Sequence, residues 1–261
     1  YQTRKQGILM KLIDSHAHLT SEEFDQDRLF ILRDLSNFFV EAVVNPGTNL
    51  ANSKANIALA KDFDNFYAQV GIHPSDVDQM GENDLDEIEK IAKEGAVAIG
   101  EIGLDYYWTT ETKDLQKEVF IKQLEMARRL DLPVVIHNRD ATEDIMEILK
   151  DYTDLKVQIH CFSTDEKTLK TYMDWGFYIS LGGVVTYKDG LNEKQAAAIV
   201  PLDRLMLETD SPYLTPKTFR GLRNDPRRII EVAQKIAEIR GQKLSTIAKW
   251  TSKNAKEFFN L

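Results

Sequence analysis

The chain has 261 residues, of which 43% are hydrophobic and 29% charged, as in a globular protein with a sizeable core. Its formal net charge of −9 excludes a broad basic surface for duplex DNA, because such binding depends on neutralising many phosphates. No apolar stretch approaches the ~20 residues that cross a bilayer, and no signal peptide is visible, so we expect no membrane partner.

One domain is expected over residues 10–261, and residues 1–9 are expected to be a tag remnant or a disordered tail. The single cysteine, Cys161, excludes an intramolecular disulfide and favours a reducing, cytoplasmic location. It adjoins His160, but neighbours in a strand face opposite sides, which disfavours a Cys/His nucleophile. We expect the protein to be a monomer.

Eight short runs rich in Val, Ile and Leu alternate with helix-like stretches. In chain order they are KLIDSH (11–16), EAVVNPG (41–47), FYAQVGIH (66–73), AVAIGEIG (96–103), PVVIH (133–137), KVQIH (156–160), GFYISLGG (176–183) and RLMLETD (204–210). Nearly continuous apolar runs are typical of parallel strands covered on both faces. Eight strand–helix units in strict alternation predict an α/β fold, a (β/α)8 TIM barrel.

Among the helix-like stretches, residues 114–130 show Phe120, Leu124 and Ala127 at helical spacing. Two closing helices are expected at 225–240 and 245–259, with Ser245 as the N-cap of the second. A doubly wound open sheet would alternate in the same way. It would not explain polar residues at the ends of nearly all strands, so the pattern favours the barrel.

All five histidines lie at or just beyond the ends of apolar runs, where a barrel gathers side chains into one mouth. His16 and His18 have the spacing that points both imidazoles to one side of an extended segment, and Asp14 precedes them on an apolar strand. The alternative is a solvent-exposed pair. Because three more strands offer ligands, we predict that both bind metal.

Three further strands end in, or contain, residues that can bind a metal. Glu101 lies in an apolar strand, where a carboxylate is costly to bury unless it is paired or metal-bound, and it is a natural bridge between two cations. His137 and His160 end the fifth and sixth strands and are predicted to be ligands rather than core histidines.

Asp210 ends the eighth strand in the segment LETDSPYL. We predict that it binds metal and also takes the proton of the attacking water, as carboxylates held close to a nucleophile often do. Asp210 and Glu101 are therefore the predicted catalytic residues. The alternative for Asp210 is a helix N-cap, since the sequence DSP suits one.

The predicted substrate contacts are Arg220, His73 and Tyr213. Arg220 lies in an arginine-rich loop after Asp210, and a guanidinium there would bind an anionic group, with phosphate the leading candidate. His73 precedes a proline and either hydrogen-bonds substrate or only braces its loop. The aromatic residues at 106–108 either stack on bases or pack in a lid.

The chain resembles the TatD family of metal-dependent deoxyribonucleases, in the amidohydrolase superfamily, through an ordered series of motifs. These are LIDSHAHL, VGIHP, GEIGLDYY, PVVIHNRD, IHCFS and ETDSPYL followed by RGLRNDP. The match covers nearly the whole chain from residue 10 onward. Only the linker at 216–219 matches loosely, and Glu101 replaces the carbamylated lysine of many superfamily members, which disfavours a dihydroorotase-like enzyme.

The resemblance implies two divalent cations at the C-terminal mouth of the barrel. One would be held by His16, His18, Glu101 and Asp210, and the other by Glu101, His137 and His160. Imidazole-rich ligands suit Zn, Mn or Ni better than Mg, although family members are usually assayed with Mg.

The function that the resemblance implies is hydrolysis of phosphodiester bonds by a 3′-5′ exodeoxyribonuclease, and we expect it to act on single-stranded 3′ ends of DNA. The first alternative is a metal-dependent carbonyl hydrolase, such as a D-aminoacyl-tRNA deacylase or an amidohydrolase. A barrel that binds metal without catalysis is the second alternative, which the complete ligand set disfavours.

Overall fold

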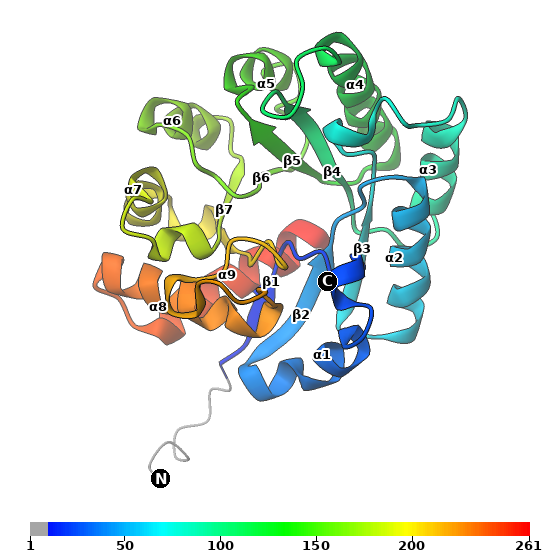
Figure 1. The fold of residues 1–261 in the computed structure, drawn as a ribbon. Helices are drawn as coiled ribbons and strands as arrows, with labels where there is room; N and C mark the ends of the chain where they lie inside the picture. The colour runs from blue at the N-terminus through cyan, green and yellow to red at the C-terminus, as the bar shows by residue number, and fades with distance from the viewer. Residues whose placement is uncertain (1–9) are drawn as a thin grey trace.

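The computed structural model describes residues 10–261, so the prediction for residues 1–9 lies outside it. Eight parallel strands follow one another in sequence order around the molecule, and helices cover their outer side (Figure 1). This is the predicted (β/α)8 barrel. None of the helices in the described part of the chain is long and apolar enough to span a membrane.

The strands are short, and the helices run between them. The strands are β1 (Leu12–Asp14), β2 (Val40–Asn45), β3 (Phe66–Val70), β4 (Ala98–Asp105), β5 (Val134–Arg139), β6 (Val157–Ile159), β7 (Tyr178–Leu181) and β8 (Leu205–Leu207). The α-helices are α1 (Arg28–Asp34), α2 (Leu50–Asp62), α3 (Asp84–Ala92), α4 (Lys113–Leu130), α5 (Thr142–Leu149), α6 (Glu166–Asp174), α7 (Leu191–Ile199), α8 (Ile229–Arg240) and α9 (Leu244–Phe259). Each strand coincides with one of the eight predicted runs.

Hydrogen bonds beyond the ends of β1 and β8 close the ring. The Ser15 backbone N–H donates to the carbonyl of Leu207, and the Asp210 N–H donates to the carbonyl of His16, both at 2.9 Å. Asp14, which is fully buried, adds a side-chain link by accepting the Thr209 N–H at 2.9 Å. The segment that carries the first two histidines is therefore joined directly to the segment that carries Asp210.

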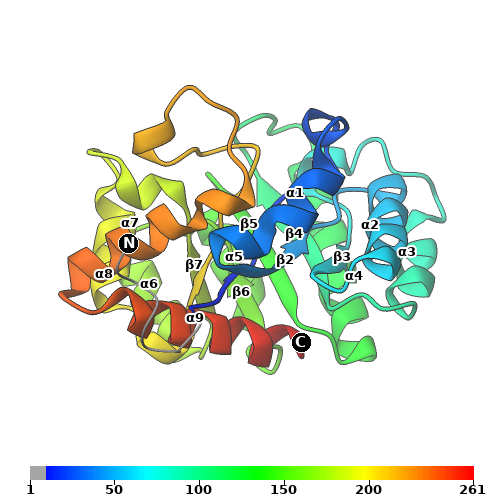
Figure 2. The ribbon, with the colours of Figure 1, turned by 90° about the horizontal axis from the view of Figure 1, so that it is seen from below.

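The barrel has an apolar filling at its lower end. Ile13, Val135 and Met206 point inward from three strands and pack with Phe258 and Phe259 of α9. Helix α9 lies beneath the strands, at the end opposite the loop that follows β8 (Figure 2). Because apolar side chains fill this end of the barrel, the polar side chains at the C-terminal ends of the strands form a site that opens only toward the mouth.

Most predicted helices agree with the structure, and one cap does not. Helix α4 begins one residue before the predicted start at 114, and α8 with its preceding turn matches the prediction for 225–240. The prediction that Ser245 caps the last helix is wrong. Helix α9 begins at Leu244, its N-cap is Lys243, and Ser245 lies inside the first turn.

Gly103 allows β4 and β5 to approach closely. A Cβ built on Gly103 would lie 2.0 Å from the carbonyl oxygen of His137, and its φ of +142° is one that side chains disfavour. Gly95 has a similar φ of +125° but nothing within 4 Å of such a Cβ, so it is a matched control.

We therefore expect Gly95→Ala to lower the free energy of unfolding by about 1–3 kcal/mol through backbone strain alone. Gly103→Ala should lose about 1–3 kcal/mol more, because the same strain is joined by a steric clash. Urea denaturation followed by circular dichroism measures both. Equal losses would show that the close approach at Gly103 is not needed.

Candidate metal centre

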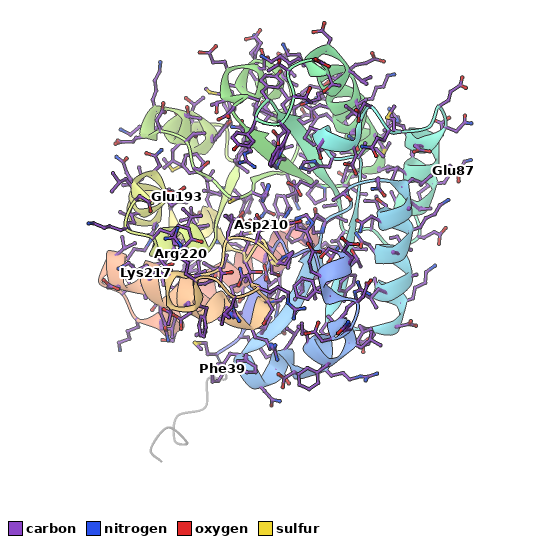
Figure 3. All side chains as sticks on the ribbon, in the orientation of Figure 1. Phe39, Glu87, Glu193, Asp210, Lys217 and Arg220 are labelled. Atoms are coloured by element: carbon purple, nitrogen blue, oxygen red, sulfur yellow. The ribbon has the colours of Figure 1, made fainter. Side chains whose placement is uncertain are left out.

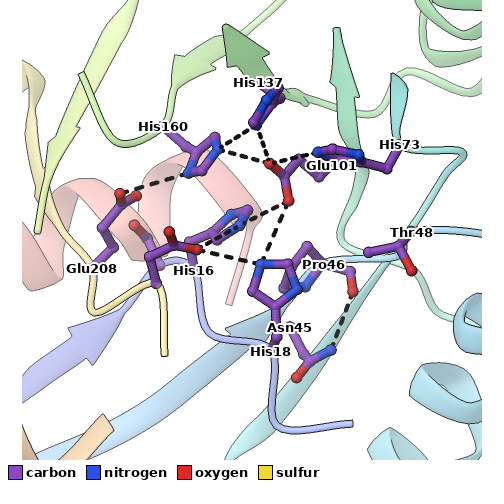
Figure 4. A network of polar contacts seen from close by, with 12 residues as sticks. His16, His18, Asn45, Pro46, Thr48, His73, Glu101, His137, His160 and Glu208 are labelled. Atoms are coloured by element: carbon purple, nitrogen blue, oxygen red, sulfur yellow. Dashed lines mark hydrogen bonds and ion pairs between the residues drawn. The ribbon is translucent and has the colours of Figure 1, made fainter. Parts of the chain in front are cut away.

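Glu101 lies at the centre of a cluster that contains all five histidines (Figure 4). Its side chain is only 3% exposed, and its two oxygens face different histidines. Oε1 lies 2.7 Å from His137 Nδ1, 2.8 Å from His160 Nε2 and 3.5 Å from His73 Nε2, whereas Oε2 lies 3.1 Å from His16 Nε2 and 3.6 Å from His18 Nε2. The strand-end histidines that are scattered in sequence thus meet around one carboxylate.

The backbone around Glu101 is held by its neighbours in the barrel. The Glu101 N–H donates to the carbonyl of Gly47 at 2.8 Å, and the Gly47 N–H donates to the carbonyl of Gly100 at the same distance. A Cβ on Gly100 would lie 2.5 Å from Gln69 Oε1, so a larger residue would force the strand outward. The absence of a side chain at Gly100 therefore allows β4 to pack closely beside Glu101.

The loop with His16 and His18 is pinned from two sides. Its His18 N–H donates to the carbonyl of Ser211 at 2.8 Å, and the Leu19 N–H donates to the side chain of Asn45 at 2.6 Å. Asn45 also donates to the carbonyl of Pro46, a contact drawn in Figure 4. Both imidazoles are thus fixed between the ends of β2 and β8.

The electrostatics of the cluster centre on Glu101. Burial alone would raise the pKa of Glu101, but the nearby histidines, His160 first among them, hold it well below its ordinary value. Burial alone would likewise lower the pKa of His160, yet Glu101 and Glu208 raise it well above the usual range. The burial of His16 outweighs its partners and lowers its pKa. A buried carboxylate with cationic partners is the arrangement that makes burying a charge tolerable.

Asp210 lies at the exposed side of the cluster. Its Oδ1 is 3.3 Å from His18 Nε2 and 3.8 Å from His16 Nε2, and its side chain is 14% exposed. Burial opposes ionisation, but the hydrogen bond from His18 lowers the pKa of Asp210 below its ordinary value. A turn rather than a helix follows Asp210, so the alternative that it caps a helix is wrong.

The donor atoms are close enough to share cations. Three groups have donor atoms within 4.8 Å of one another, namely His16, His18 and Glu101; His16, His160 and Asp210; and His73, Glu101 and His137. Imidazole nitrogens and carboxylate oxygens are the usual donors for divalent transition metals. The Nδ1 atoms of His16 and His160 are buried and lack hydrogen-bond partners within the described part of the chain. These residues fit a metal centre.

Two carboxylates behind the histidines were missed by the sequence analysis. Asp105 Oδ2 lies 2.9 Å from His137 Nε2, and Glu208 Oε1 lies 3.6 Å from His160 Nδ1. Metal-binding histidines usually donate their second N–H to a carboxylate of this kind. The sequence carried a usable signal, since Asp105 follows Glu101 by four residues on one face of β4.

His73 lies at the edge of the cluster, with its Nε2 3.5 Å from Glu101 Oε1. Its Nδ1 accepts the backbone N–H of Ser75 at 3.1 Å, and burial lowers the pKa of His73, so the ring is neutral at pH 7. A neutral imidazole that accepts through Nδ1 carries its proton on Nε2, the atom that faces Glu101. His73 thus braces its loop and also presents an N–H to the site.

The arginines after β8 divide into paired and unpaired residues. Arg223 bonds Asp27, and Arg227 bonds Asp225 and Asp34. Arg220, beside the short helix η6 (Lys217–Phe219), lies over the ring of Tyr187 at 5.2 Å, and no carboxylate in residues 10–261 is within ion-pair distance of it.

Tyr213, also predicted to contact substrate, lies beside the cluster. Its ring meets that of His18 edge to face, with 6.0 Å between centroids, and the residue is 53% exposed. Of the six predicted metal ligands, all meet in one cluster. Among the predicted substrate contacts, His73 and Tyr213 adjoin that cluster and Arg220 lies farther along the loop.

Comparisons with known proteins agree with the resemblance in the motifs. A family model described as TatD related DNase matches residues 13–260. The Bacillus subtilis protein named uncharacterized metal-dependent hydrolase YabD is 41% identical over 253 residues, which cover 96% of this chain and 99% of that protein. A protein of Escherichia coli K12, named uncharacterized metal-dependent hydrolase YcfH, is 36% identical to this chain over 97% of each.

A solved structure shows the same fold. The crystal structure of YJJV, a TatD homolog from Escherichia coli K12, superposes with a TM-score of 0.91 at 27% identity, over 97% of this chain and 100% of that one. The residues matched by the family model include all of the strand-end histidines, Glu101 and Asp210. This chain belongs to the TatD family.

Proposed function

We propose that this protein, a metal-dependent hydrolase of the TatD family, cleaves phosphodiester bonds at single-stranded 3′ ends of DNA. One observation carries the proposal. The two oxygens of Glu101 face two different sets of histidines, with His16 and His18 on one side and His137 and His160 on the other. A shared carboxylate between paired cations is typical of two-metal phosphodiester hydrolysis. The description of the matching family model, TatD related DNase, agrees with it.

The residues that would hold the cations are those that the family resemblance implies. His16, His18 and Asp210 would hold one, His137 and His160 would hold the other, and Glu101, whose two oxygens face these two sets, would be shared. When bound, two divalent cations supply Lewis-acid stabilisation of the phosphate and make a water more acidic. Zn, Mn or Ni suits this imidazole-rich set, and Mg is the fourth candidate.

Asp210 is the proposed general base. It is the exposed carboxylate of the cluster, and its lowered pKa leaves it ionised at neutral pH. A carboxylate in that position can take a proton from a water that enters from the mouth. The burial of Glu101 within the ring of histidines suits a holding role rather than proton transfer.

The remaining polar groups are proposed to bind the substrate. His73 would donate its Nε2–H to a phosphate oxygen, and Arg220 would bind a phosphate bidentately through its unpaired guanidinium. Tyr213, with its exposed ring beside His18, would contact the sugar or base of the terminal nucleotide. Since the chain carries a net charge of −9, only this local pocket and its cations would attract DNA.

Glu101→Ala tests the bridge. Because both proposed sites share this carboxylate, we expect the variant to lose both equivalents of metal and to fall to background activity. His137→Ala should lose mainly one equivalent. Elemental analysis of chelator-free protein measures both. Glu87→Ala, on the outer helix α3, is the control (Figure 3). Two equivalents of metal and normal turnover in Glu101→Ala would refute the shared ligand.

Asp210→Asn tests the base. The amide retains an oxygen that can bind metal but does not accept a proton at neutral pH, so turnover should fall by about 10²- to 10⁴-fold while metal binding partly persists. Asp203→Asn, at the opposite end of β8, removes the same charge and should leave turnover unchanged. An unchanged rate in Asp210→Asn would leave the residue a structural role only.

End preference tests the substrate. Labelled single strands with free 3′ ends should be shortened in an EDTA-sensitive reaction, whereas covalently closed circles should resist. Arg220→Ala should weaken binding strongly, and Arg204→Ala, which removes a charge at the other end of the barrel, should not. Binding should depend only shallowly on salt, with a log–log slope of about −0.7 per phosphate contact.

Two results would contradict this substrate assignment. Efficient cutting of closed circles would exclude an exonuclease and leave the metal centre intact. EDTA-sensitive turnover of D-aminoacyl-tRNA or simple esters, without turnover of DNA, would instead favour the carbonyl hydrolase.

A further inference from the structure

An exposed aromatic pair follows β4 at the mouth of the barrel. Tyr107 is 55% exposed and Trp108 is 70% exposed. Their rings meet edge to face, with 4.8 Å between centroids and an interplanar angle of 88°. Large aromatic rings that remain this accessible contribute little to a core, and an exposed ring face can receive a planar ligand while the perpendicular neighbouring ring meets the edge of that ligand.

Arg139 completes this surface. Its backbone lies opposite that of Asp105 in the neighbouring strands β4 and β5. Its Cζ lies 3.8 Å from the centroid of the Tyr107 ring and 5.4 Å from that of the Trp108 ring. Arg139 is exposed, and no carboxylate among residues 10–261 lies within ion-pair distance of its guanidinium. The guanidinium is therefore positioned by contacts with the two rings, and its charge is available to bind an anion.

The preceding residue, Tyr106, differs from this pair because its side chain has polar partners. Its hydroxyl donates to Asp144 at 2.7 Å, and the Lys113 ammonium lies 4.2 Å from the centre of its ring. Tyr107 and Trp108 lack side-chain hydrogen bonds of this kind in the described chain. Polar contacts with the helices around it account for Tyr106, whereas Tyr107 and Trp108 contact each other and Arg139 and remain largely exposed.

One carboxylate ties the exposed pair to the metal centre. Asp105 Oδ1 accepts the backbone N–H of Tyr107 at 3.0 Å and that of Trp108 at 3.5 Å. The other oxygen of Asp105 lies 2.9 Å from His137 Nε2. The backbone that carries both rings is thus anchored to the histidine cluster.

We propose that Tyr107, Trp108 and Arg139 form a base-stacking platform that binds an unpaired nucleobase of the DNA strand next to the nucleotide being cleaved. Arg139 would hold the phosphate beside that base. The inference rests on the proposed nuclease function and adds a subsite to it. Aromatic side chains with a nearby cation bind single strands in a sequence-tolerant way, because every base has a π-face. Bases in a duplex have their faces covered, so the platform also selects unpaired ends.

The test compares binding of two nuclease-resistant phosphorothioate strands to the metal-loaded protein. One strand is oligothymidylate and the other is an abasic strand of equal length and charge. Oligothymidylate should quench tryptophan fluorescence and bind more tightly than the abasic strand. Trp108→Ala should lose the quenching and weaken oligothymidylate binding by about 5- to 150-fold, the range that stacking on one aromatic residue provides.

Three further variants sharpen the comparison. Trp108→Phe should lose the quenching signal but keep most of the affinity, measured by anisotropy of a labelled strand, since a phenyl ring still stacks. Arg139→Gln should weaken binding of both strands, because it removes the phosphate contact. Trp250→Phe, on α9 at the opposite end of the barrel, should keep both quenching and affinity.

Equal affinity of Trp108→Ala and the unaltered protein, or equal binding of the two strands, would overturn the platform. Its failure is distinguishable from failure of the proposed function. If the protein shortens DNA and Trp108→Ala does not change strand affinity, the nuclease function stands and the platform is refuted. Quenching by oligothymidylate without any DNA hydrolysis supports the platform and refutes the nuclease.

Discussion

The burial of the Glu101 charge is the constraint on which the rest of this structure depends. A carboxylate in the middle of a barrel strand is costly unless cations or donors surround it. Five imidazoles from the ends of four other strand segments meet that need. Only a closed barrel brings such segments to one point, and the bonds of His16 and Ser15 to the β8 segment complete the closure.

The two carboxylates behind the histidines, Asp105 and Glu208, follow from the same constraint. Histidines that turn one nitrogen to Glu101 turn the other outward, and two of these second nitrogens face carboxylates: Asp105 lies 2.9 Å from His137 Nε2, and Glu208 lies 3.6 Å from His160 Nδ1. In a metal-loaded site such carboxylates orient the imidazoles and raise their basicity. Asp105 extends this order outward, since its other oxygen holds the backbone of Tyr107 and Trp108. The histidine cluster and the exposed aromatic residues are thus joined through hydrogen bonds to one carboxylate, Asp105.

The sequence was sufficient for the barrel and for the residues that meet in its mouth. In a parallel barrel, side chains at the ends of different strands meet at one mouth. His137 and His160 could therefore be placed in the same cluster from their strand-end positions alone. The sequence also singled out Arg220 among the loop arginines. It did not predict the partner of Arg227, because Asp34 lies some 190 residues earlier in the chain and the contact exists only in the folded barrel. The start of α9 was missed because the chain reaches helical geometry one residue before Ser245.

The claim that two cations share Glu101 is tested most directly by electron paramagnetic resonance during titration of the metal-free protein with Mn²⁺. Two Mn²⁺ ions joined by a carboxylate are close enough for magnetic coupling, since paired sites hold their ions about 3.5–4 Å apart. Shared ligation predicts that, as the second equivalent binds, the hyperfine signal of isolated Mn²⁺ gives way to a coupled spectrum. A signal of uncoupled ions that simply doubles, or saturation at one equivalent, would contradict it.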